Sequence, residues 1–275
     1  MRTFSVPEQI LRLLFIFFLV CFLFGFLLAY ILYLLGLTSA TNSSHIAVFS
    51  IEISFFLLLL ISFLQSKYEK AKLGSLEEHQ SFSVRVAHWW LPFSILIRFI
   101  WEFGWCICSF YLNDLYGTFF LENGNTPLAR EQAYALMEQH KWTWFFVIYG
   151  VADARYLVGD SFIFSLELLV SIFGGLVSIY ALYLSKNKRY AEASFYFIFI
   201  AAVESFGTFL YFLTEICNKF YFLDTENPMN WFFKFFGLNF LWIIAYFIVL
   251  AHELRKMRKQ DAMASCKFHP VRQDQ

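Results

Sequence analysis

Residues 89–112 read WWLPFSILIRFIWEFGWCICSFYL, and this stretch decides the class of fold. It is almost entirely apolar and long enough to exceed the ~20 residues that a helix needs to cross a bilayer. Arg98 and Glu102 nevertheless lie near its middle. A charged side chain at that depth costs several kcal/mol, so it normally faces a partner, a cavity or a substrate. The segment therefore predicts a membrane helix that carries chemistry.

Five more apolar runs of similar length predict an all-α, polytopic membrane helix bundle of about six transmembrane helices. The runs cover residues 13–35, 46–64, 161–184, 193–213 and 231–251. Hydrophobic residues, among them 38 Phe, make up 59% of the chain, and charged residues make up only 15%. This composition excludes an ordinary soluble domain. Run 13–35 is longer than the core of a signal peptide, which favours a retained helix, although Thr38–Ala40 would suit cleavage.

Charge and cysteine usage limit the partners. The net charge is zero, which implies no nucleic-acid partner, and the five Cys show no metal-ligand spacing. Lys and Arg are concentrated before run 13–35 and after runs 46–64, 161–184 and 231–251. By the positive-inside rule we expect a multi-pass protein with both termini cytoplasmic. The long loop 113–160 is expected to hold an interfacial helix at 129–140.

The polar residues inside the runs are the candidate site. Arg98 and Glu102 are four residues apart and can form a pair on one helical face. Such a pair either neutralises itself within the helix packing or forms the polar wall of a ligand cavity. Glu167 has no basic residue one turn away, so it is expected either to stay protonated, as general-acid chemistry needs, or to be hydrogen-bonded to a neighbouring helix.

The last run adds Asn239 and Trp242 on one helical face. Asn239 could join two helices through a hydrogen bond, and Trp242 could pack or offer its π face to a cation. Glu52 and Glu204 are further embedded carboxyls without a role assigned from the sequence. At the entrance of run 161–184, helix capping or a loop ion pair with Arg155 accounts for the acidic residues Asp153 and Asp160.

Four segments together resemble the emopamil-binding protein family, the sterol Δ8–Δ7 isomerases and relatives that share the EXPERA domain. They are IRFIWEFGW (97–105), YGVADARYLVGDSFIFSLELL (149–169), ESFGTFLYFLTE (204–215) and FFGLNFLWII (235–244). The resemblance covers residues 86–250 and implies a four-helix core there. Residues 1–85 would add two N-terminal transmembrane helices and a cytoplasmic loop, and residues 251–275 a basic cytoplasmic tail.

The resemblance implies an intramembrane pocket of the endoplasmic reticulum that protonates the C8=C9 alkene of a sterol and removes a proton from C7. Glu102 and Glu167 match the acidic positions, whereas Asn239 and Trp242 match the polar and aromatic pocket residues. Such an isomerisation moves only protons, so it implies no metal and no redox cofactor.

One position departs from the family pattern, because Arg98 stands where the isomerases carry His. A guanidinium does not exchange protons near neutral pH, and next to Glu102 it should hold that carboxyl ionised. The alternative reading is therefore a non-catalytic membrane protein that binds sterols or cationic amphiphiles. Gly174 and Gly175 would permit close helix approach, which leaves a homodimer possible.

Overall fold

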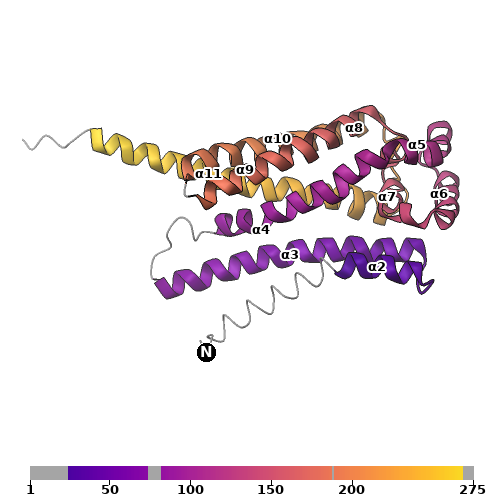
Figure 1. Cartoon of the computed structure of the whole chain (residues 1–275), viewed down its shortest axis with the longest axis horizontal. Coiled ribbons are helices and arrows are strands. Elements are labelled where there is room, and N and C mark those ends of the chain that lie inside the picture. The colour runs from indigo at the N-terminus through magenta and orange to yellow at the C-terminus, as the bar shows by residue number, and fades with distance from the viewer. Residues whose placement is uncertain (1–23, 74–81, 188, 269–275) are drawn as a thin grey trace, which may run out of the picture.

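The computed structural model describes residues 24–73, 82–187 and 189–268, and this part of the chain is built from helices (Figure 1). Within these ranges, five helical segments are long and apolar enough to cross a membrane, namely Ala40–Tyr68, Trp90–Asn123, Ser161–Lys186, Ala191–Cys217 and Met229–Arg255. The prediction of an all-α polytopic membrane protein is confirmed. Residues 13–23 of the predicted run 13–35 lie outside the described residues, and its described part holds the ten-residue helix α2 (Gly25–Leu34).

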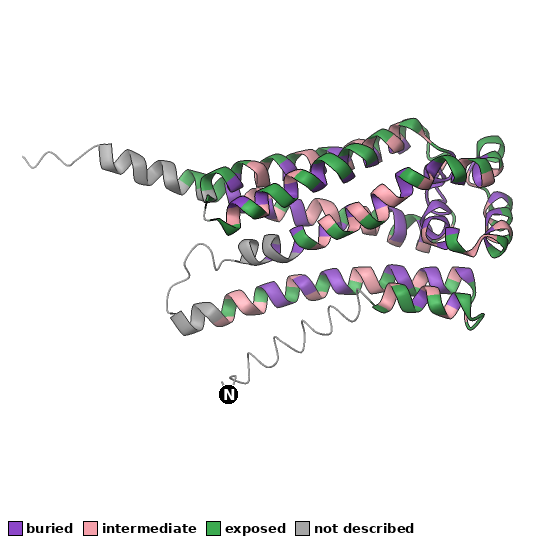
Figure 2. Ribbon diagram, in the orientation of Figure 1, coloured by how far each residue is buried: buried purple, intermediate pink, exposed green. Residues whose placement is uncertain are grey.

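The long helices run side by side along the longest axis of the molecule (Figure 1). They are α3 (Ala40–Leu73), α10 (Tyr190–Cys217), α11 (Leu238–Phe268) and two continuous helices made of consecutive segments, namely α4 (Phe82–Ile97) with α5 (Phe103–Asn123) and α8 (Ser161–Leu168) with α9 (Gly175–Lys186). The short helices α6 (Pro127–Gln139) and α7 (Trp144–Gly150) gather at one end. Exposed residues follow the outer sides of the long helices in Figure 2, and many of these are large and apolar, such as Phe110, Phe206 and Phe247, as lipid contact requires.

Three π-helical segments occur in the described part of the chain, each continuous with a longer helix. They are η3 (Arg98–Glu102) between α4 and α5, η6 (Leu169–Gly174) between α8 and α9, and η7 (Met229–Gly237) before α11. A π segment inserts extra backbone into a helix and is frequently found at functional sites. Segments η3 and η6 pack against each other, and η3 contains both Arg98 and Glu102.

The predicted loop 113–160 is shorter than expected, because α5 continues to Asn123. The end of the apolar run at Leu112 marks where hydropathy falls, but the helix itself stops only at Gly124, whose φ of +65° suits a glycine. A helix is present where one was expected at 129–140, namely α6, which starts at Pro127 because Thr126 caps its first turn. Its position at the membrane interface stays a prediction.

Candidate active site

A cavity of about 700 Å³ lies inside the bundle, a size typical of small-molecule sites. Its walls are mostly aliphatic and aromatic side chains from the membrane helices, and α2 contributes Phe26 and Leu27. Three carboxyl groups also line it, those of Glu102, Glu167 and Glu204. Each of these three side chains is less than a tenth exposed, at 7%, 9% and 6% respectively. An apolar chamber with a few converging acids is suited to proton chemistry on a lipid-like molecule.

Arg98 lies behind the cavity wall and does not pair with Glu102, so that predicted pair is wrong. Its Nη2 atom lies 2.6 Å from Oε1 of Glu204, and both side chains are buried. Its Nη1 donates to Ser178 Oγ at 3.0 Å, and its Nη2 donates to the Tyr246 hydroxyl. Arg98 and Glu204 are far apart in the sequence, so spacing along one helix could not reveal this partnership.

Gly174 in η6 makes room for the Arg98–Glu204 ion pair. A Cβ atom at Gly174 would lie 3.0 Å from Glu204 Oε1 and 3.2 Å from Arg98 Nη1. Residue 174 therefore contributes space for this ion pair, which is a more specific role than the close helix approach inferred from the Gly174–Gly175 sequence.

Glu102 faces the cavity without the ion-pair partner that the sequence suggested. Its Oε2 atom is buried and has no hydrogen-bond partner within the described part of the chain. A buried carboxylate without a partner is costly and is stabilised when it takes up a proton. Because Arg98 is paired with Glu204 and not with Glu102, Glu102 is free to accept a proton.

Glu167 is held by a tyrosine from the loop that precedes its helix. The hydroxyl of Tyr156, in the 3₁₀ turn η5 (Ala154–Tyr156), donates to Oε1 of Glu167. Burial, followed by the charge of Glu167, raises the pKa of Tyr156 well above its ordinary value, so the tyrosine stays protonated and remains a donor. The sequence left open a protonated Glu167 or one hydrogen-bonded to a neighbouring helix. The structure shows a hydrogen bond from a loop tyrosine and none from a neighbouring helix among the described residues. This bond does not prevent protonation, because a carboxylic acid still accepts a hydrogen bond at its carbonyl oxygen. Glu167 also lines the cavity.

Asn239 and Trp242 also line the cavity, on α11. The Asn239 amide donates to the Tyr149 hydroxyl at 2.8 Å. Trp242 stacks on Tyr246 with ring centroids 6.1 Å apart, and the guanidinium of Arg98 lies 6.0 Å from its ring centroid. The structure therefore brings four of the five predicted site residues to one cavity and places Arg98 directly behind it.

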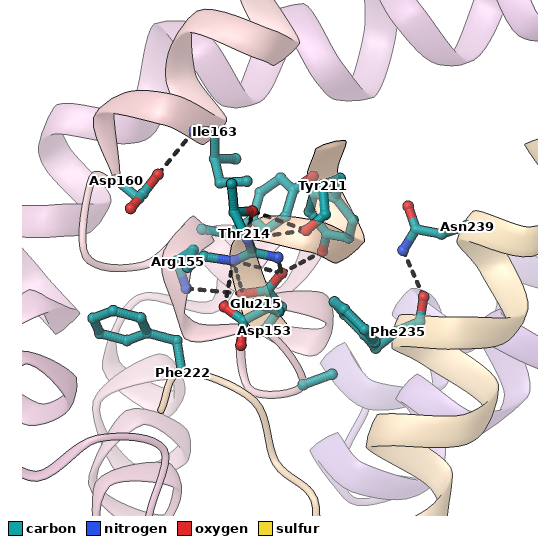
Figure 3. Close-up of polar contacts among 12 residues, drawn as sticks. Asp153, Arg155, Asp160, Ile163, Tyr211, Thr214, Glu215, Phe222, Phe235 and Asn239 are labelled. Atoms are coloured by element: carbon teal, nitrogen blue, oxygen red, sulfur yellow. Dashed lines mark hydrogen bonds and ion pairs between the residues drawn. The ribbon is translucent and has the colours of Figure 1, made fainter. Parts of the chain in front are cut away.

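A buried ion cluster around Arg155, next to the cavity-lining residue Tyr211, was not recognised as a whole from the sequence. Arg155 is paired with Asp153 at 2.7 Å and with Glu215 at 2.8 Å, and all three side chains are at most 1% exposed. Arg155 also donates to Thr214, and Tyr211 donates to Asp153 (Figure 3). The expected loop ion pair with Arg155 therefore exists, but it is buried. The two acids of the cluster, Asp153 and Glu215, are about sixty residues apart in the sequence and give no local signal, which is why the cluster was missed.

The helix cap expected at the entrance of run 161–184 is also present, since Asp160 accepts a hydrogen bond from the Ile163 backbone N–H at 2.9 Å.

No group of three or more His, Cys, Asp or Glu side chains within the described ranges is placed to hold a metal ion. Histidine is also absent from the cavity lining as far as the described residues extend. Besides the three carboxyls, the polar groups along the cavity wall are the hydroxyls of Tyr149, Tyr156, Tyr211 and Thr208, the thiol of Cys108, the amide of Asn239 and the indole N–H groups of the lining tryptophans.

The fold and the cavity together define a multi-pass helical membrane protein whose bundle encloses an apolar cavity lined by three carboxyl groups. No protein-family model matches the chain. Among curated proteins, it is similar to the 3-beta-hydroxysteroid-Delta(8),Delta(7)-isomerases of Cavia porcellus (29% identity over 96 residues) and Mus musculus (23% over 169 residues). The corresponding protein of Rattus norvegicus is 23% identical over 125 residues.

These matches are partial. The alignment with the Cavia porcellus protein covers 35% of this chain and 42% of the relative, and the alignment with the Mus musculus protein covers 60% and 68%. The Rattus norvegicus alignment covers 45% and 54%. The similarity is weak, but it points to the same family as the sequence motifs and supports a relationship to the sterol Δ8–Δ7 isomerases.

Proposed function

We propose that this protein is a sterol Δ8–Δ7 isomerase of the endoplasmic reticulum membrane, with both termini in the cytoplasm. The observation that carries the proposal is the placement of Glu102 and Glu167 on one apolar cavity, with Arg98 withdrawn behind its wall. The named relatives act on 3β-hydroxysteroids, and an apolar chamber of this volume suits a rigid lipid.

In the proposed reaction one carboxyl group supplies a proton and the other accepts one. Glu167 in its acid form adds a proton to C9 of the alkene, which leaves a carbocation at C8. Glu102 as carboxylate then takes a proton from C7, and the C7–H electron pair forms the C7=C8 bond. The two carboxyls have exchanged protonation states, and the site is reset between turnovers when Glu102 releases its proton to solvent and Glu167 takes up a proton from solvent. The carbocation is stabilised by the carboxylates and by the face of Trp242 where water is excluded.

The Arg98–Glu204 ion pair bears on the expectation that Arg98 would hold Glu102 in its ionised form. A guanidinium bonded to Glu102 would favour the carboxylate permanently and would block its reprotonation. Because Arg98 is bound by Glu204, Ser178 and Tyr246, its charge is largely compensated behind the wall.

The alternative function is a non-catalytic sterol- or amphiphile-binding protein with the same cavity. It is favoured by the absence of a histidine from the described cavity lining. The two functions differ in whether a bound Δ8 sterol is converted.

The test is conversion of a Δ8 sterol by membranes that contain the protein, measured by gas chromatography with mass detection. We expect product from the wild type and a loss of at least about 100-fold in turnover for Glu102→Gln and Glu167→Gln, since general acid–base groups contribute roughly 10²–10⁴-fold. Glu131→Gln, at an exposed position on α6, is the matched control and should retain full activity. Binding without conversion in the wild type would replace the isomerase by the binding protein.

A further inference from the structure

The amide of Asn239 can take only one orientation in the cavity. Its Nδ2 atom donates to the backbone carbonyl of Phe235 at 2.5 Å and to the Tyr149 hydroxyl at 2.8 Å. A flipped amide would place Oδ1 against the Phe235 carbonyl, and two acceptors repel each other at that distance. Figure 3 shows the amide nitrogen turned toward Phe235 and the oxygen turned away.

A directional chain of hydrogen bonds behind Asn239 reinforces this orientation. Asp153 is paired with Arg155 and accepts from the Tyr211 hydroxyl. Because the Tyr211 proton is used there, the 3.0 Å contact between the Tyr211 and Tyr149 hydroxyls requires Tyr149 to be the donor. Tyr149 can then only accept from Asn239, which agrees with the Asn239 amide being its donor.

Both N–H bonds of the Asn239 amide are therefore committed to the protein, and Oδ1 remains. Asn239 lines the cavity and is partly exposed, and its Oδ1 is not among the buried atoms that lack a partner. The group that Asn239 offers to a ligand is a hydrogen-bond acceptor and not a donor.

We propose that Oδ1 of Asn239 accepts a hydrogen bond from a ligand hydroxyl, and that Tyr149, Tyr211 and Asp153 are the positioning residues that fix its polarity. This inference rests on the proposed function, because the hydroxyl in question is the 3β-hydroxyl that the relatives' names contain. The site should therefore discriminate a 3β-hydroxysterol, which can donate, from the matching 3-ketone, which can only accept. A site built to bond a hydroxyl rejects an analogue that lacks the donor, because its own polar group is then left unpaired.

The test compares the affinities of 5α-cholestan-3β-ol and 5α-cholestan-3-one for the full-length protein in detergent micelles. Neither compound has a ring double bond, so turnover does not interfere. We expect the wild type to prefer the alcohol by about tenfold, the ratio that one hydrogen bond of about 1.4 kcal/mol gives. Asn239→Leu should bind both compounds with a ratio near one, and Tyr149→Phe should lower the ratio.

Tyr116→Phe is the matched control, because its buried hydroxyl contacts Thr143 at 2.6 Å and Tyr116 does not line the cavity. This variant should keep the wild-type ratio. Equal wild-type affinity for alcohol and ketone would overturn the inference and leave the proposed function intact. A preference that survives Asn239→Leu would also overturn it. If neither compound binds, sterol binding itself fails and the inference fails with it.

Discussion

Replacement of Arg98 by leucine should be one of the most destabilising single changes in the bundle. Arg98 is fully buried, lies 2.6 Å from the Glu204 carboxylate and donates to Ser178 and Tyr246. Removing one partner of a buried ion pair leaves an uncompensated charge and costs about 3–5 kcal/mol. We therefore expect Arg98→Leu to lower the free energy of unfolding by about that amount.

The double variant Arg98→Leu/Glu204→Leu separates the ion pair from simple loss of packing. Both charges are then removed, so the double variant should be less destabilised than the sum of the single variants, by about 1–3 kcal/mol. The assay is denaturation by sodium dodecyl sulfate of the protein in bicelles. The exposed Arg189–Glu192 pair serves as control, and Arg189→Leu should leave stability nearly unchanged. Additive effects of Arg98→Leu and Glu204→Leu would refute the ion-pair argument.

Two further changes test the space around the site and the ion cluster beyond it. Gly174→Ala should destabilise the protein, because its Cβ atom would lie 3.0 Å from Glu204 Oε1, whereas Gly104→Ala, with nothing within 4 Å, should be neutral or slightly stabilising. Both are compared by thermal unfolding, and equal effects would contradict the close fit. Asp153→Asn should cost about 3–5 kcal/mol in the same denaturation assay, because Arg155 loses one of its buried partners; a loss below about 1 kcal/mol would mean that Glu215 alone compensates the guanidinium.

The membrane class of the fold was predictable because it depends on local composition. A run such as residues 89–112 must be helical in a bilayer, since every backbone group has to be satisfied within the segment. The limits of helices were less predictable. Helix α5 continues to Asn123 because the chain stays helical after it leaves the apolar run, and hydropathy does not report on that part.

The residues of the site were partly predictable, but their partners were not. Embedded polar residues such as Glu102, Glu167 and Asn239 are conspicuous in apolar runs, and the structure places all three on one cavity. The partner of Arg98 could not be inferred, because an i,i+4 spacing suggested Glu102 and only the packing of α10 against the bundle brings Glu204 closer. The Tyr156 donor to Glu167 comes from a loop whose conformation depends on the buried pairing of Asp153 with Arg155.

The most direct test of the central claim, proton transfer by cavity carboxyls, is turnover of a Δ8 sterol in deuterated water with the label located in the product by mass spectrometry and NMR. The account predicts a Δ7 product with solvent deuterium at C9 from the wild type, and no labelled product from Glu167→Gln. A Δ7 product without deuterium at C9, or labelled product from Glu167→Gln at the wild-type rate, would contradict it.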